Sequence, residues 1–329
     1  MNNGEYRAAL TLARRFSSLA GKQTSSQDLL VGERMTGTAL HYLGNQTDAR
    51  RHLERTLGGY PARPPPNRYQ FDQRVTARAT LARILWLQGF PDRAIRSARE
   101  SVEAAQASED VLSLCNALVQ SACPIALFVG DLASAECYIA MLLDHSTRHG
   151  LALWHVRARG FKGMLLNQIG DTAAGLRLLG AALAELHETK YTGHLMAFLG
   201  AFAEALGRVG QVAEGLVAVD QALARSERTE GRWGAAELLR IKGELVLLEG
   251  AQSSVDAAQD HFSRALNLAR QQGALSWELR IATSLSRCWH DRGRTKESCD
   301  LLSPIYDRFT EGFGTGDLVS AKTLLAALR

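Results

Sequence analysis

Residues 163–175, GMLLNQIGDTAAG, decide the fold of this chain. A small residue, a glycine seven positions later and a second small residue five positions after that lie in a segment rich in Ala and Leu. Gly170 suits the end of a helix because few other residues tolerate the backbone conformation needed there, and Asp171 favours the start of the next helix. Small side chains at Gly163 and Gly175 let two helices approach closely. The stretch therefore predicts a helix–turn–helix hairpin.

The same pattern recurs along the chain at an even period. The turn glycines are spaced 45, 41, 40, 40, 40 and 43 residues apart, at Gly44, Gly89, Gly130, Gly170, Gly210, Gly250 and Gly293. The residues seven positions earlier are all small: Gly37, Ala82, Cys123, Gly163, Ala203, Gly243 and Ser286. Those five positions later are small as well, except that an insertion at 252–254 shifts one match to Ala258. This period predicts a repeat array in which each hairpin buries its apolar face against its neighbours.

We therefore expect an all-α protein, a right-handed superhelical α-solenoid of antiparallel helix hairpins with a period of about 40–45 residues. The 329 residues are too many for one ordinary globular core but suit a repeat array. We expect a single domain over 1–329, with a partial hairpin at 4–20, hairpins at 26–58, 70–106, 110–148, 152–187, 191–227, 232–271 and 275–309, and a closing helix at 315–328. Pro64–Pro66 mark the longest loop, and Pro124 predicts a local irregularity in the first helix of hairpin 110–148.

Composition argues against several classes of function. The net charge is +4, and no block of five or more Lys and Arg residues occurs, so we expect no direct nucleic-acid binding. The five Cys include no C-x-x-C pair, which argues against a disulfide framework or a zinc site. No apolar run approaches the about 18–20 residues that span a bilayer, and the N-terminus has no signal-peptide core. We expect a cytoplasmic protein that does not enter the membrane.

No catalytic signature is present. The sequence contains no H-E-x-x-H, no G-x-S-x-G and no glycine-rich phosphate loop, so we expect no enzyme activity and no cofactor. His145 and His149 lie four residues apart on a predicted helix, but no Cys or carboxylate with matching spacing completes a metal site. Cys115 and Cys123 share a helical face and are expected to fill space in the core.

The pattern of small residues around a turn glycine resembles the tetratricopeptide repeat (TPR), although the period exceeds that family's about 34 residues. More specific stretches are HYLG at 41–44, ARILWLQG at 82–89, ACPIAL at 122–127, LRIKGEL at 239–245, QGALSWELR at 272–280 and FTEGF at 309–313. These resemble the C-terminal repeat region of bacterial STAND-type signalling ATPases, in which a winged-helix DNA-binding domain or a nucleotide-cyclase domain and a P-loop ATPase domain precede a helical-repeat tail. The resemblance implies a regulatory tail that senses a ligand or partner. The sequence shows neither a P-loop nor a winged-helix pattern, so we expect it to be a fragment of such a regulator.

In TPR arrays the first helices line the concave surface, and the resemblance places a polar set of residues there. The predicted binding residues are Arg34, His41, Tyr42, Arg83, Trp86, Gln120, Arg157, Asn167, Arg240, Arg280 and Arg287. The recurring arginines suit carboxylates, phosphates or acidic peptides, although the alternative is a solvated or self-paired face. Glu204, Glu237 and Glu244 lie among the C-terminal arginines and are expected to neutralise them, which leaves the N-terminal part as the less neutralised site. We expect Arg83 and Trp86 to be replaceable by Ala without loss of folding.

The leading hypothesis is a non-catalytic protein–protein interaction and regulatory sensing module that binds a protein or peptide in the concave groove, including other domains of the parent regulator. The alternative is a receptor for a small metabolite that changes the shape of the solenoid. A long open groove favours the peptide, and a closed pocket of a few hundred Å3 favours the metabolite. An apolar face along residues 4–20 also suggests self-association.

Overall fold

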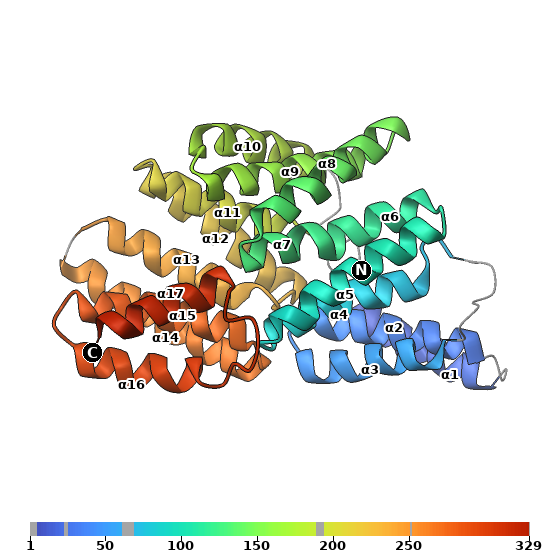
Figure 1. Ribbon diagram of the computed structural model, residues 1–329, viewed down its shortest axis with the longest axis horizontal. Helices are drawn as coiled ribbons and strands as arrows, with labels where there is room; N and C mark the ends of the chain where they lie inside the picture. Colours follow the sequence, from blue (N-terminus) through green and yellow to red (C-terminus); the bar gives the residue numbers. More distant parts are fainter. Residues whose placement is uncertain (1–4, 23–25, 61–68, 189–193, 251, 329) are drawn as a thin grey trace.

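The computed structural model describes residues 1–329 except 1–4, 23–25, 61–68, 189–193, 251 and 329 (Figure 1). The described residues form helices and no strand, which confirms the all-α expectation. The first helices of the hairpins are α2 (Ser26–Tyr42), α4 (Gln73–Leu87), the run α6 (Val111–Ala117), η1 (Leu118–Ala122) and α7 (Cys123–Val129), α9 (Ala152–Ile169), α11 (Leu195–Arg208), α13 (Ala235–Leu248) and α15 (Leu275–His290). The second helices are α3 (Gln46–Gly59), α5 (Pro91–Ala107), α8 (Leu132–Arg148), α10 (Thr172–Glu188), α12 (Val212–Thr229), α14 (Gln252–Gln272) and α16 (Thr295–Tyr306).

Two further helices flank these pairs. Helix α1 (Tyr6–Lys22) packs on α2, and α17 (Gly316–Ala327) packs on α15 and α16. The proline triplet Pro64–Pro66, residue 4 of the predicted partial hairpin and residues 191–193 of the predicted hairpin 191–227 lie outside the described residues. The chain is thus a succession of antiparallel helix pairs in which the first helices of neighbouring pairs also touch.

The turns between paired helices have the glycine conformation and the aspartate caps that the sequence predicts. All seven turn glycines adopt a positive φ, between 74° and 96°, and Gly170 ends α9 at 96°. The carboxylate of Asp131 accepts a hydrogen bond from the Ser134 N–H at 3.0 Å, and that of Asp171 accepts one from the Ala174 N–H at 3.1 Å. Each aspartate therefore satisfies a free amide at the start of a second helix.

The predicted packing register is confirmed at the first-helix glycines. A Cβ added at Gly163 would lie 2.8 Å from Leu179 Cγ and 3.0 Å from the Gly175 carbonyl oxygen, and one added at Gly243 would lie 2.6 Å from the Phe262 ring. These distances are too short for any side chain, so the second helix packs directly against the backbone of the first, through its own backbone at Gly163 and through the Phe262 ring at Gly243.

The irregularity expected at Pro124 takes the form of a π-helical turn. The Cys123 N–H donates to the carbonyl of Leu118, five residues back, within the segment η1 that joins α6 to α7. Proline has no N–H and its ring crowds the carbonyl four residues earlier, so the widened turn accommodates it without ending the helix.

The same run corrects the expectation about apolar stretches. Among the described residues, the helical run Val111–Val129 has 19 residues with a mean hydropathy of 1.7, which is long and apolar enough to cross a membrane. However, 78% of that window is buried inside the array. The protein itself covers this run, as it covers other core helices.

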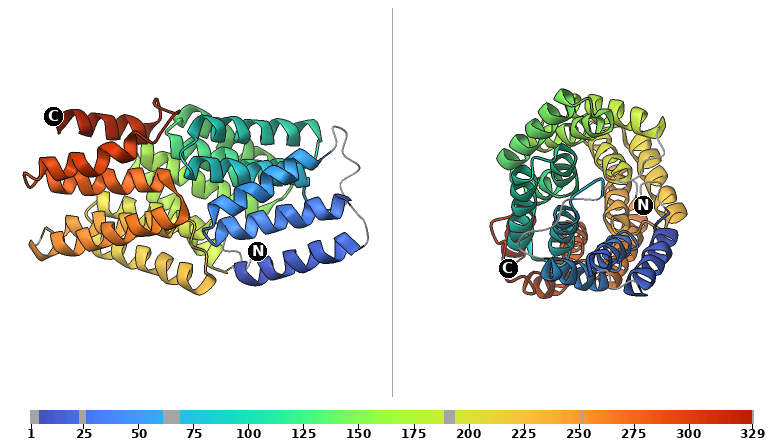
Figure 2. Two further views of the ribbon diagram at one scale, coloured as in Figure 1. Left: turned by 90° about the horizontal axis from the view of Figure 1, so that it is seen from below. Right: turned by 90° about the vertical axis from the view of Figure 1, so that its right-hand side faces the viewer.

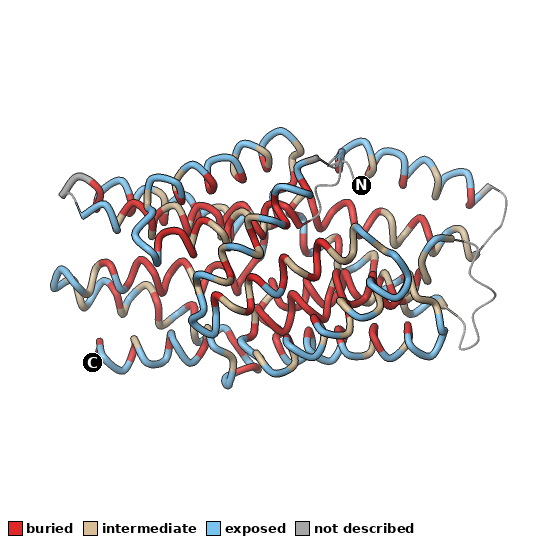
Figure 3. Tube along the Cα trace, turned by 90° about the horizontal axis from the view of Figure 1, so that it is seen from above, coloured by how far each residue is buried: buried red, intermediate tan, exposed pale blue. Residues whose placement is uncertain are grey.

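The solenoid curves until its ends meet. Viewed along the long axis, the helices follow a ring, and the C-terminal hairpins lie beside the N-terminal ones (Figure 2). We call this contact between α1–α7 and α13–α17 the seam. It includes a Trp86–Trp277 ring contact at 4.6 Å, an Arg93–Glu311 ion pair at 3.2 Å and a hydrogen bond from the Ser276 hydroxyl to the Trp86 carbonyl. Buried positions gather where the helices face one another, and exposed positions line the outer helices (Figure 3).

Candidate functional site

A pocket lies on the inner side of the array, between the first helices α9, α11 and α13, and residues of the seam close its far side. Its volume is about 110 Å3. We call it the central pocket. Its apolar walls are formed by Phe128, Met164, Met196, Ala197, Gly200, Ala201, Ala205, Trp233, Leu238, Ile241 and Trp277, and its polar residues are Asn167, Gln168, Glu204, Arg208, Glu237 and Arg280.

Small residues of α11 make room for this pocket. Ala197 and Ala201 are half-buried and line it, and Gly200 lies about one turn after Ala197 and directly before Ala201. A Cβ at Gly200 would lie 3.0 Å from Leu238 and 3.2 Å from Ile241, so α13 packs directly against the backbone of α11 there. The recess therefore results from the same use of small residues that packs the hairpins.

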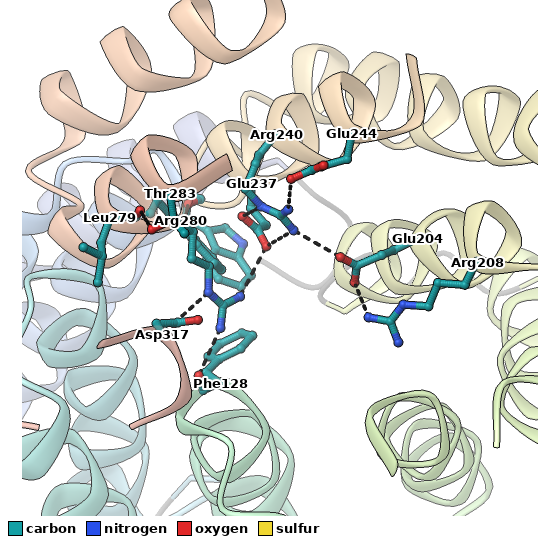
Figure 4. Close-up of polar contacts among 12 residues, drawn as sticks. Phe128, Glu204, Arg208, Glu237, Arg240, Glu244, Leu279, Arg280, Thr283 and Asp317 are labelled. Carbon is teal, nitrogen blue, oxygen red and sulfur yellow. Dashed lines mark hydrogen bonds and ion pairs between the residues drawn. The ribbon is translucent and has the colours of Figure 1, made fainter. Parts of the chain in front are cut away.

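One end of the pocket adjoins a set of ion pairs, which we call the C-terminal ion-pair network and which comprises Glu204, Glu237, Arg240, Glu244, Arg280 and Asp317 (Figure 4). Arg240 lies 2.8 Å from Glu237, 3.3 Å from Glu204 and 3.6 Å from Glu244. Arg280 lies 3.2 Å from Glu237 and 2.7 Å from Asp317. These contacts confirm that the carboxylates among the C-terminal arginines neutralise them.

Burial and pairing oppose each other in this network. Burial raises the pKa of Glu237, but Arg240 and Arg280 outweigh that effect and hold it below its usual value. Burial raises the pKa of Asp317 above its usual value, and Arg280 offsets the rise only in part. The network is therefore charged and internally paired, and its side chains have few free contacts to offer a ligand.

The N-terminal part of the inner surface differs in its contacts. His41, Tyr42, Arg83 and Trp233 form what we call the Arg83 cluster. The Arg83 guanidinium lies 5.3 Å from the centre of the Tyr42 ring and 5.7 Å from that of the Trp233 ring. The His41 and Trp233 ring centres are 5.5 Å apart. Trp233 also lines the central pocket, so the cluster and the pocket share a wall.

The side chains of this cluster are buried. Arg83 is 2% exposed and His41 0%, and Trp86, which follows on the same helix, is 2% exposed. Trp86 stacks on Phe128 with ring centres 4.4 Å apart. These residues were expected to stand in an open groove, and the structure corrects that placement because closure of the solenoid covers them. Because Trp86 packs against Phe128 and Trp277, the expectation that it can be replaced by Ala without loss of folding loses its basis, whereas for Arg83 that expectation stays a prediction.

The other predicted binding residues occupy varied places. Arg34 donates to the Gln73 side chain at 2.7 Å, and burial lowers its pKa to about 10. Gln120 accepts from the Tyr42 hydroxyl at 3.5 Å, Arg157 is buried with its guanidinium over the Trp154 ring, and Arg287 is exposed. Of the predicted set, Asn167 and Arg280 line the central pocket. Their roles in binding remain predictions.

Sequence reasoning missed the apolar walls of the pocket. Trp233 and Trp277 resemble packing residues in the sequence, and in the structure they pack and line the pocket at once. The signal that marked the recess was an excess of small residues in α11, where Ala197, Gly200 and Ala201 stand outside the repeating register.

The histidines and cysteines singled out in the sequence do not form a metal site among the described residues. His145 and His149 stack with ring centres 6.2 Å apart, and no group of three or more metal-ligating side chains occurs among the described residues. Burial raises the pKa of Cys115 to about 11 and that of Cys123 further, which suits inert core thiols. A second recess of about 400 Å3 between α8 and α9 is lined by aliphatic residues with Glu136 and Lys162.

Comparison with known proteins identifies the architecture. No family model matches the chain, and no curated protein matches its sequence. Among solved structures, a Rap protein in complex with competence and sporulation factor is 14% identical with a TM-score of 0.64, over 99% of this chain and 86% of that chain. The Rap conjugation gene regulator of plasmid pLS20, in complex with the Phr* peptide, is 12% identical with a TM-score of 0.64, over 93% and 78%.

A third structure is relevant to the resemblance noted in the sequence. A STAND signal-transduction ATPase with a tetratricopeptide repeat sensor, from Pyrococcus horikoshii, is 11% identical with a TM-score of 0.52, over 97% of this chain and 49% of that chain. Identities this low show the fold alone. The chain has the fold of the TPR-like helical repeat proteins.

Proposed function

We propose that this chain is a non-catalytic regulatory module that binds a peptide, or a peptide segment of a protein partner, in the central pocket. The observation that carries the proposal is the pocket itself: apolar walls and a polar rim on the inner side of a TPR-like solenoid. Its volume of about 110 Å3 suits one or two side chains and is smaller than the about 300–1,000 Å3 typical of small-molecule sites. The Rap regulator crystallised with the Phr* peptide supports a peptide as ligand.

The pocket suggests how such a segment is held. An apolar side chain enters between Met164, Met196 and Leu238, where it is removed from water. Asn167 is 6% exposed, and its side-chain oxygen lies against Gly175 within the α9–α10 hairpin, so that side chain faces away from the ligand. Arg208 at the exposed rim of the pocket adds a polar contact.

The wider context is also part of this proposal. We place the module in a bacterial, cytoplasmic regulator in which it controls an ATPase or a DNA-binding domain. The STAND ATPase with a TPR sensor supports this context because its fold matches 97% of this chain. In this scheme the chain needs no cofactor or metal, and it does not bind nucleic acid or membranes directly.

The test fills the pocket. Ala201→Trp places a large side chain where a half-buried alanine lines the pocket, and Ala184→Trp adds the same bulk on the exposed face of α10 as a control. Both variants and the wild type are used to select binders from a displayed random peptide library, and the affinities of the selected peptides are measured by calorimetry. We expect wild type and Ala184→Trp to bind the same peptides and Ala201→Trp to lose them.

Native mass spectrometry of the purified chain extends this test to co-purifying molecules. If the wild type retained a small metabolite that Ala201→Trp lacked, the ligand of the pocket would be a metabolite and not a peptide. Selected peptides that bind all three proteins equally would show that the central pocket is not the binding site.

A further inference from the structure

Arg83 is a buried cation that forms no ion pair with any of the residues that the structure describes. Its side chain is 2% exposed, and its one hydrogen bond, from Nη2 to the Tyr42 hydroxyl, is long at 3.5 Å. Its Nε and Nη1 atoms are buried and have no acceptor. Burying a guanidinium is costly unless a charge or hydrogen bonds compensate it, and an orphaned buried donor calls for a bound ion, water or ligand.

The described side chains that contact or interact with Arg83 are aromatic rings and neutral histidines. The Nδ1 atom of His41 lies 2.8 Å from the Gln46 side-chain oxygen, and burial, together with Arg83, holds the pKa of His41 well below its usual value, so the ring is neutral. Burial, Arg157 and Arg83 lower the pKa of His194 in the same way. The Trp233 indole N–H is buried and, like Arg83, has no acceptor.

The cluster therefore offers hydrogen-bond donors and positive charge next to the central pocket. Arg83 contributes two nitrogens, Nε and Nη1, whose N–H groups have no acceptor, and Trp233 contributes one N–H while its ring forms part of the pocket wall. A guanidinium pairs well with carboxylate and phosphate oxygens because its planar fork matches their geometry. The C-terminal arginines at the other end of the pocket already have carboxylate partners.

We propose that the Arg83 cluster binds the anionic group of the ligand, a carboxylate or a phosphate, while an apolar part of the same ligand occupies the central pocket. This inference rests on the proposed function and names the chemistry of the ligand. Arg83 is the counter-ion of that group, and the Trp233 indole N–H donates a further hydrogen bond to it. The site thus selects acidic segments over neutral or basic ones.

The first test uses inorganic phosphate as the probe. Thermal unfolding of the full chain is followed in increasing sodium phosphate and, at matched ionic strength, in sodium chloride. The variants are Arg83→Met, which keeps a long apolar side chain, and Arg177→Met, which removes an exposed arginine of α10 outside the cluster. Phosphate stabilises folded proteins in general, so we expect it to raise the unfolding temperature of wild type and Arg177→Met more than that of Arg83→Met.

Two results of this experiment would overturn the inference. One is the same phosphate response in Arg83→Met as in wild type. The other is no rise in the unfolding temperature of wild type in phosphate, which would show that the buried guanidinium takes no anion.

The second test separates the sources of the anion. Peptides selected by wild type are synthesised with a free C-terminal carboxylate, with an amidated C-terminus and with a phosphoserine at an internal position. We expect one of the two anionic forms to bind wild type at least about thirtyfold more tightly than the neutral form, and we expect that preference to vanish in Arg83→Met. Loss of all peptides in Ala201→Trp with the preference intact in Arg83→Met contradicts this inference alone, whereas unchanged binding in Ala201→Trp contradicts the proposed function.

Discussion

Arg240 on α13 and Arg83 on α4 both lie on first helices and are both largely buried, but their surroundings differ. The Arg240 side chain is 11% exposed and has three carboxylates within 3.6 Å. Arg83 is 2% exposed and lies between the rings of Tyr42 and Trp233, with a single long hydrogen bond. One scaffold thus holds buried arginines in two ways. Arg240 is paired with carboxylates of the same chain, whereas Arg83 has buried N–H groups without acceptors.

The largest expected effect comes from making the same substitution in both regions. Arg240→Met leaves Glu237 with one arginine in place of two, so we expect it to lower the free energy of unfolding by about 3–5 kcal/mol. Arg83→Met removes a buried charge with no carboxylate beside it, so we expect no loss, or a gain of about 1–4 kcal/mol. Urea unfolding of the two variants and the wild type measures both values. Equal losses would mean that an unseen partner stabilises Arg83.

A destabilising effect on one side of the comparison only is expected where the two regions meet. Trp86 stacks on Phe128, contacts Trp277 across the seam and has the Arg280 guanidinium 5.2 Å from its ring centre. We expect Trp86→Ala to cost about 3–5 kcal/mol in the free energy of unfolding because it leaves a cavity at the seam. Trp289→Ala is the control. Trp289 also lies on a first helix but is only half-buried, so its replacement should lower the free energy of unfolding less. An unfolding free energy equal to wild type in Trp86→Ala would indicate that the seam does not close in solution.

The sequence predicted the hairpins well because their physics is local. A glycine with positive φ, an aspartate at the next helix start and small residues at Gly163 and Gly175 act within about a dozen residues of one another. The pairing of Arg240 with Glu237 and Glu244 was equally accessible because residues three and four apart share a helix face.

The seam could not be predicted from the local sequence in that way. Its closure depends on a small rotation added at every repeat, and no single stretch of sequence records the sum. The hydrogen bond from Arg280 to the Phe128 carbonyl and the burial of Arg83 and Trp86 follow from this closure. An open groove was therefore predicted at a place where the structure has a closed seam and a smaller pocket.

Acid titration distinguishes the two regions by the pH at which each loses stability. His41 and His194 have folded-state pKa values below the usual 6.5, so the unfolded chain binds those protons first. Their contribution to stability is complete above pH 6.5 and falls as the pH drops from there, by about 1.4 kcal/mol per pH unit for each histidine. The pKa of Glu237 lies below its usual 4.5, so the contribution of the C-terminal ion-pair network persists to lower pH and is lost only as the pH falls from 4.5 through the folded-state value.

Two variants test which residue causes the loss of stability in each pH range. His194→Gln should flatten the decline in the free energy of unfolding between pH 6.5 and 4.5, and Glu237→Gln should lower stability at neutral pH and remove part of the decline below pH 4.5. Asp317 opposes Glu237, because a folded-state pKa above 3.8 means that the folded chain takes up that proton first and gains stability as the pH falls towards 3.8. Urea unfolding of the wild type and of both variants at half-unit pH steps measures the free energy of unfolding in each pH range. If His194→Gln retained the full decline above pH 4.5, burial of this histidine near Arg83 would not be the cause of the loss of stability in mild acid.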